Sequence, residues 1–286
     1  MPALRTVLCP VDLSELSVRQ TAIAAEICRA FGARLVLHHN LKGATAAGVG
    51  WMWAAEHGGV VSEQQAEDRL RALQDTLAAG VEHEARLTHG PSTQAVLAVG
   101  EAVAADLIVL STHGATDDGH TSVSEAILDH SNRALLVLHE PAVDREVPHF
   151  GAVTAEPQRV LVPVDLGPGS RSALAFAFDL ARLMSVELHL LHVVEKGGTA
   201  AGGTTTALEA LRREVPEALQ SRVEFPVETG EPAIAISDAA RRLAVACIVM
   251  GEHSHRTLRS WFRHDHARDV LHHAPCPVWY VPNPAA

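Results

Sequence analysis

The chain contains the same sequence pattern twice, because every strong feature of its first half recurs in its second half in the same order. Such a repeat indicates one folding unit that occurs two times along the chain. We therefore expect two homologous domains, residues 1–140 and 159–286. Residues 141–158 contain three prolines and mixed charge without periodicity, which predicts a linker. The matching segments are 7–17 with 160–170, 33–40 with 186–194, 87–114 with 227–254, and 124–138 with 267–281.

Short apolar runs alternate with segments of helical spacing within each half. Runs without polar alternation are typical of strands that are covered on both faces, as in a parallel sheet. The first helical segment has a stripe of apolar residues, and Gly32 predicts its end. The pattern predicts an α/β fold of two tandem doubly wound domains, each a five-stranded parallel sheet with helices on both faces. The apolar runs of the first half are "TVLCP", "RLVLHH", "HEARLTH", "DLIVL" and "ALLVL", and the helical stripe is Leu16, Ile23, Ile27 and Phe31.

Charge and composition narrow the choice of partners and compartment. The chain has 34 acidic and 23 basic residues, a formal charge of −11, which argues against nucleic acid and an anionic membrane surface as partners. The amino terminus lacks the order of a signal peptide, and no apolar run reaches the roughly 18 residues of a membrane span. Four cysteines without C-x-x-C spacing predict small buried side chains in a reducing compartment. We expect a soluble cytoplasmic protein; the cysteines are Cys9, Cys28, Cys247 and Cys276.

Candidate ligand-binding residues follow from the predicted sheet, since ligands bind beyond the carboxyl ends of its strands where the strand order reverses. A carboxylate after the first strand could accept from an exocyclic amine or hold a metal. It could equally cap the next helix. Such residues, given as equivalent pairs in the two halves, are Asp12 and Asp165 after the first strand, Asn40 and Val193 after the second, and Ser111 and Gly251 after the fourth.

The chain resembles the universal stress protein family in its tandem two-domain form. The resemblance rests on "VLCPVDLSELS" with "VLVPVDLGPGS", "LHHN" with "LLHVV", "IVLSTHG" with "IVMGEHS", and "HHAPCPVWYVP", and it covers nearly all of both halves. It implies a five-stranded parallel sheet with flanking helices, as in adenine nucleotide alpha hydrolase-like folds. It also implies that repeats or subunits pair through their last strands, so "PCPVWYV" is expected to be a pairing strand.

Nucleotide-binding members of that family carry a glycine motif after the fourth strand: Gly, two residues, Gly, nine residues, Gly, then Ser or Thr. Glycines let backbone amides approach phosphates, and the hydroxyl residue opens a helix whose N-terminus favours anions. In the second half the spacing is kept, but Asp265 replaces the hydroxyl residue and would repel a phosphate. We therefore expect a degenerate site there. The four motif positions in that half are Gly251, Ser254, His264 and Asp265.

The first half has a loop about three residues shorter than the motif. It keeps the second glycine and the hydroxyl residue, so this half is the better candidate for a weak adenine-nucleotide site. Asp117 and Asp118 would require a divalent cation to bridge them to phosphate, which implies ATP or ADP with Mg²⁺. The motif positions are Ser111, Gly114, Thr121 and Ser122.

The segment at residues 251–269 contains four histidines, His253, His255, His264 and His266. Histidine and carboxylate are ligands that zinc uses. Residues two apart on a helix point to different faces, however, and 18 histidines are spread along the chain. We interpret the segment as a solvated loop without a metal, and a His-rich metal-binding variant remains an alternative.

These patterns predict a non-enzymatic stress-response or regulatory module of the universal stress protein family. A related nucleotide hydrolase would require a Ser/Gly-rich loop after the first strand, and "CPVDLSELS" has no glycine. The alternative is a structural, protein-interacting pseudo-dimer that binds no nucleotide. A further homodimer and an unidentified protein partner are left open.

Overall fold

A computed structural model describes the fold for residues 4–41, 62–77, 80–112, 123–139, 157–165, 170–184, 186–195, 203–251, 269–270 and 273–283. The first-repeat strands are β1 (Thr6–Pro10), β2 (Arg34–Leu41), β3 (His83–His89), β4 (Leu107–Thr112) and β5 (Ala134–His139). The second-repeat strands are β6 (Gln158–Pro163), β7 (Val186–Val194), β8 (Val223–Glu224), β9 (Val227–Thr229), β10 (Cys247–Gly251) and β11 (Val278–Val281). The helices are α1 (Glu15–Phe31), α3 (Glu63–Asp75), α4 (Ser92–Ala102), α5 (Val123–His130), α6 (Arg171–Leu183), α7 (Gly203–Glu214) and α8 (Pro232–Leu243), with a 3₁₀-helix at Glu217–Arg222.

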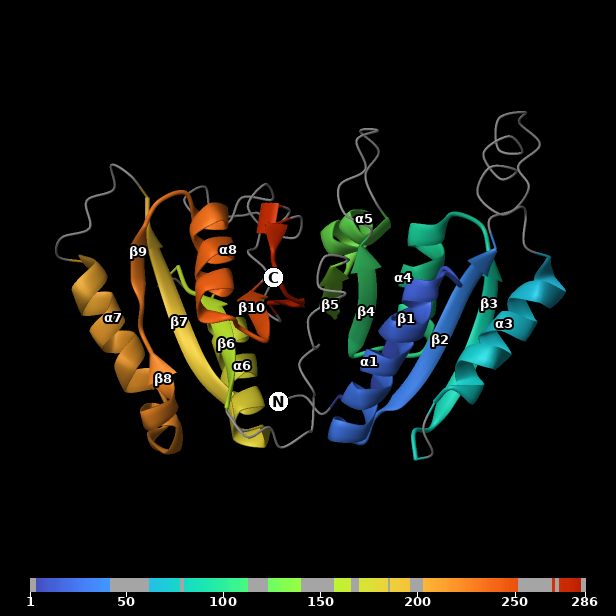
Figure 1. Ribbon diagram of the computed structural model, residues 1–286, viewed down its shortest axis with the longest axis horizontal. Coiled ribbons are helices and arrows are strands. Elements are labelled where there is room, and N and C mark those ends of the chain that lie inside the picture. Colours follow the sequence, from blue (N-terminus) through green and yellow to red (C-terminus); the bar gives the residue numbers. More distant parts are fainter. Residues whose placement is uncertain are drawn as a thin grey trace. The chain divides into compact units, whose positions relative to one another are not determined.

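The chain divides into two compact units. The first unit contains β1 to β4 with α1, α3, α4 and α5, and the second contains β5 to β11 with α6, α7 and α8. In the first unit the strands are parallel in the order β3-β2-β1-β4. Helices α1 and α3 cover one face of this sheet and α4 covers the other, with α5 packed against α4 (Figure 1). The strand order therefore reverses between β1 and β4.

The second unit repeats this plan. Its parallel strands run in the order β11-β10-β6-β7-β8, and β9 also pairs with β7. Here the order reverses between β6 and β10, and α6 and α8 lie on opposite faces of the sheet (Figure 1). The predicted fold class, a tandem α/β fold with mostly parallel sheets and helices on both faces, is confirmed.

The last strands of the two repeats pair with each other, as the resemblance implied. Strand β5 belongs to the second compact unit and pairs antiparallel with β11, with Leu136 opposite Trp279. The Trp279 side chain is fully buried and its ring lies 5.0 Å from that of Phe176 on α6. The stretch "PCPVWYV" is therefore a pairing strand. The boundaries predicted at residues 140 and 159 remain predictions, and residues 141–156 of the predicted linker lie outside the described residues.

Local signals in the sequence explain the ends of several helices. Gly32 follows α1 with a left-handed backbone (φ 65°), the conformation that glycine adopts without steric cost. Ser62 and Gln65 form a complete capping box at the start of α3. Ala104 and Ala244, which occupy equivalent positions after α4 and α8, also have left-handed backbones with φ of 50° and 48°. Both repeats therefore end this helix in the same way.

Four of the five runs predicted in the first half, those of β1, β2, β4 and β5, lie in the core, whereas the residues of β3 are exposed or half-buried. Val7, Leu8 and Cys9 of β1 are fully buried, because helices cover both faces of the sheet. All four cysteines are buried and free, which confirms the expectation for these side chains. None of the helices in the described part of the chain combines the length and hydrophobicity that crossing a membrane requires.

Candidate ligand site at the strand ends

Asp12 and Asp165 each form a hydrogen bond with a serine at the start of the first helix of their repeat. The Asp12 Oδ1 atom accepts from the Ser14 amide at 2.9 Å and from the Ser17 hydroxyl at 2.8 Å. Asp165 makes the equivalent contact, since its Oδ1 accepts from the Ser170 hydroxyl at 2.5 Å. Ser17 and Ser170 are buried. The helix-start interpretation of the two carboxylates thus has direct structural support.

A histidine on the second strand fixes the residue before each of these aspartates. His39 on β2 contacts the Val11 carbonyl through Nδ1 at 2.8 Å, and His192 on β7 contacts the Val164 carbonyl through Nδ1 at 3.0 Å. A carbonyl oxygen only accepts, so Nδ1 must carry the proton in both rings. The same contact in both repeats holds the backbone carbonyl of the residue before the aspartate against the second strand.

Gln20 of α1 joins the ends of β1 and β4 where the strand order reverses in the first unit. Its Nε2 donates to the Pro10 carbonyl at 2.7 Å and to the Val109 carbonyl at 2.8 Å. Its Oε1 accepts from the Ser111 hydroxyl at 3.0 Å, and the Ser124 hydroxyl donates to the Ser111 carbonyl at 3.1 Å. Only 2% of Gln20 is exposed. Ser111, the first position of the predicted phosphate motif, is therefore fixed by α1 and α5.

The described residues of the second repeat have no counterpart of this connection. Ala173 occupies the position of Gln20, and Gly251 occupies the position of Ser111. Ala173 is fully buried and Gly251 ends β10. The second repeat therefore lacks both the side-chain amide of Gln20 and the hydroxyl of Ser111. If only one of these two groups were present, it would be a buried polar group without its partner.

Asn40 belongs to a second polar network, at the ends of β2 and β3. Its Nδ2 donates to the Gly90 carbonyl at 2.8 Å and lies 3.3 Å from the Ser92 hydroxyl at the start of α4. Its Oδ1 accepts from the Thr88 hydroxyl at 3.0 Å, and Thr88 also lies 2.7 Å from His38 Nε2. Because the Thr88 proton goes to Asn40, the proton of the second contact comes from His38.

Burial and hydrogen bonding define the charge state of His38. Its side chain is 1% exposed, and its Nδ1 has no hydrogen-bond partner among the described residues. Burial lowers the pKa of His38 to about 4, and the neighbouring His39 and Arg86 act in the same direction. His38 is therefore neutral at pH 7, which matches the single proton that its contact with Thr88 requires.

The equivalent positions in the second repeat are apolar or differently paired. Leu191 and Val193 replace His38 and Asn40, and both are buried. Glu228 on β9 lies opposite Val193 in the sheet, and its carboxylate pairs with Arg242 of α8. Within the described ranges, the polar network at the end of the second strand exists only in the first repeat.

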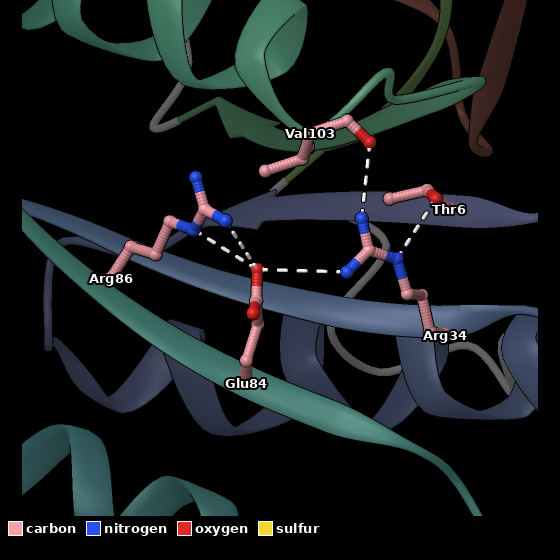
Figure 2. A network of polar contacts seen from close by, with 5 residues as sticks. All are labelled: Thr6, Arg34, Glu84, Arg86 and Val103. Carbon is pink, nitrogen blue, oxygen red and sulfur yellow. Dashed lines mark hydrogen bonds and ion pairs between the residues drawn. The ribbon is translucent and has the colours of Figure 1, made fainter.

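A separate network at the amino ends of the same strands is structural. Arg34 donates to the Thr6 hydroxyl and to the Val103 carbonyl that follows α4, each at 3.2 Å (Figure 2). Glu84 lies between Arg34, at 3.8 Å, and Arg86, at 3.0 Å (Figure 2). These contacts join β1, β2, β3 and the end of α4 at the amino ends of the strands, whereas the candidate site lies at their carboxyl ends.

Several predicted site residues lie outside the described residues, and their assignments stay predictions. The same holds for the histidines at 253, 255, 264 and 266, on which the alternative metal hypothesis depends. The part of the chain that the structure describes contains no group of three His, Cys, Asp or Glu side chains arranged to hold a metal. The motif residues concerned are Gly114, Thr121 and Ser122 in the first repeat and Ser254, His264 and Asp265 in the second.

The sequence offered signals for some contacts that we did not predict. The spacing from Asp12 to Ser17 recurs from Asp165 to Ser170, and His39 recurs as His192. Gln20 lies on the same face of α1 as the apolar stripe, where a polar residue indicates a buried hydrogen bond. No comparable signal identifies Thr88 as the partner of Asn40.

The two units thus define a class of protein, tandem doubly wound α/β domains in which the strand order reverses beside the first strand of each repeat. The sequence profile of the Universal stress protein family matches residues 3–139 and 156–282, and the chain belongs to this family. A universal stress protein from Archaeoglobus fulgidus DSM 4304 aligns over 99% of both chains with 21% identity and a TM-score of 0.71. A protein of unknown function from Pseudomonas aeruginosa PAO1 aligns over 98% of this chain and 93% of its own, with 17% identity and a TM-score of 0.60. These two structures share the fold, and the curated protein sequences gave no match.

Proposed function

We propose that this member of the universal stress protein family is a cytoplasmic, non-enzymatic regulatory module that binds an adenine nucleotide through its first repeat only. The proposal rests on a difference between the two repeats in the residues at the carboxyl ends of their strands. The first repeat retains polar side chains at the ends of three strands, namely Asp12, Asn40 and Ser111. The second repeat retains only Asp165, because Val193 and Gly251 replace the other two.

The residues at these strand ends support binding rather than catalysis. In the first repeat, Asp12 is hydrogen-bonded to Ser17 of α1, Asn40 to Ser92 at the start of α4, and Ser111 to Gln20. These hydrogen bonds hold the three side chains in place at the strand ends, where a ligand can contact them. ATP or ADP with Mg²⁺ is the ligand class that we propose, with the cation offsetting the negative charge of these strand ends.

A thermal-shift experiment with matched variants tests the proposal. Ligand that binds only the folded state raises the melting temperature, by an amount that corresponds to about 2.7 kcal/mol at one hundred times Kd. We expect ATP–Mg²⁺ to stabilise the wild type and the Ser254→Trp variant, but not the Gly114→Trp variant. Gly114 and Ser254 occupy the second glycine position of the phosphate motif in the first and second repeats. No shift at millimolar nucleotide, or a shift that only Ser254→Trp removes, contradicts the proposal.

A second candidate function rests on the pairing of β5 with β11. This pairing joins strands from the two repeats within one compact unit and buries Trp279, which supports a structural role for the repeat pair as a pseudo-dimer. A purely structural, protein-interacting role would follow if neither repeat bound nucleotide in the experiment above.

A further inference from the structure

Strand β3 forms the outer edge of the sheet in the first unit, because it ends the strand order beside β2 (Figure 1). The Leu35 amide donates to the Glu82 carbonyl at 2.8 Å, so the peptide groups of the even-numbered residues of β3 face β2. The peptide groups of Ala85 and Leu87 therefore face away from β2, and they make no hydrogen bond to another described residue. This edge can accept one more strand.

The equivalent edge of the second repeat is interrupted. Residues 83–89 correspond to residues 223–229, and there the strand is split into β8 and β9 at Phe225 and Pro226. Pro226 occupies the position of Arg86 and lacks the N–H group with which Arg86 faces β2. Short strands and prolines protect sheet edges against pairing with another chain. Strand β3 has neither protection, since it continues for seven residues without a proline.

The charges on β3 match those of a second β3 in antiparallel orientation. Glu84 and Arg86 project from the same face of the strand (Figure 2), and both are half-buried. In an antiparallel pair centred on Ala85, Glu84 of each copy lies directly opposite Arg86 of the other. Opposite charges in this position stabilise a sheet, whereas like charges destabilise it. A pair centred on Glu84 or on Arg86 would bring two like charges together, so the charges select a single register.

The backbone pattern selects the same register. Directly opposed residues in an antiparallel pair exchange both of their N–H···O bonds when their peptide groups face each other, and the peptide groups of Ala85 lie on the open edge. A central Ala85 pair is therefore hydrogen-bonded. Glu84 and Arg86 then fall in the non-hydrogen-bonded pairs, in which the side chains lie closer together. Ala85 is exposed, and its small side chain leaves room for this approach.

We infer that two copies of this chain pair through β3, antiparallel and centred on Ala85, and form one continuous sheet across the dimer. The contact is two-fold symmetric, so the assembly closes at two chains. Glu84 then lies between Arg34 and Arg86 of its own chain and Arg86 of the partner subunit. The inference goes beyond the proposed function, because the interface requires no nucleotide.

Charge-reversal variants of the full chain test the register. Glu84→Arg places two arginines opposite each other, and Arg86→Glu places two glutamates opposite each other. Each variant alone should therefore dimerise about tenfold more weakly than the wild type, or more weakly still. A one-to-one mixture of the two variants restores every opposite-charge pair and should form a heterodimer of nearly wild-type affinity.

Sedimentation equilibrium measures these Kd values, and circular dichroism verifies that each variant is folded. A wild type that stays monomeric at its highest soluble concentration overturns the inference. So does a mixture of the two variants that associates no better than either variant alone, because the charges would then not lie opposite each other.

A cysteine at the centre of the interface tests the pairing without changing a charge. The two Ala85 Cα atoms should lie about 5.5 Å apart, a separation that a disulfide spans. The four native cysteines are buried, so the accessible thiol of Ala85→Cys is the introduced one. Diamide, which takes up the two electrons and two protons of the thiols, should convert this variant into a covalent dimer on a non-reducing gel.

The matched control is His83→Cys, at a position that is also exposed on β3. The two copies of this residue would lie roughly 14 Å apart in the proposed pair, too far for a disulfide. We expect diamide to cross-link Ala85→Cys and to leave His83→Cys monomeric. Equal cross-linking of both variants, or of neither, overturns the inference.

Discussion

At the scale of single residues, His38 shows how a buried polar side chain can fit inside an apolar sheet. Its single N–H group donates a hydrogen bond to the Thr88 hydroxyl, and the Thr88 hydroxyl donates one to the Asn40 side chain. The neutral ring satisfies this chain of donors, while a charged ring would be buried with its second nitrogen lacking any partner among the described residues. Protonation of His38 is therefore coupled to the stability of the first unit.

This coupling predicts a loss of stability in mild acid. The pKa of His38 is about 4 in the folded protein, below its ordinary value of 6.5, so the unfolded state binds more protons between these two values. The free energy of unfolding should be unaffected above pH 6.5 and should fall by up to about 3 kcal/mol as the pH drops to 4. Urea unfolding of wild type and His38→Leu across this range measures the difference. The substitution introduces the side chain that the second repeat has at the equivalent position, Leu191.

The control for this experiment is an exposed histidine. His130→Gln removes a solvent-exposed side chain on α5 and should leave the pH dependence as in the wild type. If His38→Leu and wild type lose the same stability between pH 6.5 and 4, the coupling does not exist.

At the scale of elements, the sequence predicted strands better than it predicted contacts. The five runs of the first half correspond to β1 to β5. The runs of β1, β2, β4 and β5 are largely apolar because these strands are mostly buried, whereas β3, at the end of the strand order, has only exposed and half-buried residues. The stripe on α1 predicted its covered face, with Ile23 and Ile27 buried. Gln20 lies within that stripe, yet its hydrogen bond to Val109 joins residues 89 apart in sequence. Such a partner is fixed by the packing of α1 over β1 and β4, which periodicity does not encode.

The same limit applies to the candidate site. The sequence identified Asp12, Asn40 and Ser111 because strand ends can be located from the runs. It left the role of Asp12 open, and the contacts of Asp12 with Ser14 and Ser17 establish its structural role at the start of α1. Asn40 and Ser111 likewise have partners on other elements that became visible only in three dimensions.

The ends of α4 and α8 give a prediction about equivalent elements. Ala104 and Ala244 have left-handed backbones, a conformation that costs a residue with a side chain roughly 1–2 kcal/mol and glycine very little. Ala104→Gly and Ala244→Gly should each stabilise the protein, by about 1 kcal/mol after the extra chain entropy of glycine is subtracted. Thermal unfolding compares them with Ala102→Gly, a control inside α4 that should destabilise. Destabilisation by both left-handed variants would show that their backbone geometry carries no strain.

At the scale of the whole molecule, the two repeats share a fold and differ in the polar contacts at the carboxyl ends of their strands. Both keep the contact from aspartate to serine and the contact from histidine to carbonyl, which shape the turn after the first strand. Among the residues that the structure describes, only the first repeat has the polar networks of Gln20 and Asn40. The pairing of β5 with β11 uses the last strand of each repeat, so both repeats contribute to this part of the sheet.

In the function proposed above, the first repeat binds an adenine nucleotide and the second repeat does not. The most direct test is the stoichiometry of ligand bound per chain, measured by equilibrium titration of the full chain with ATP–Mg²⁺. We expect one site per chain, lost in Gly114→Trp and retained in Ser254→Trp. Two equivalent sites, or no binding at millimolar ligand, would contradict it.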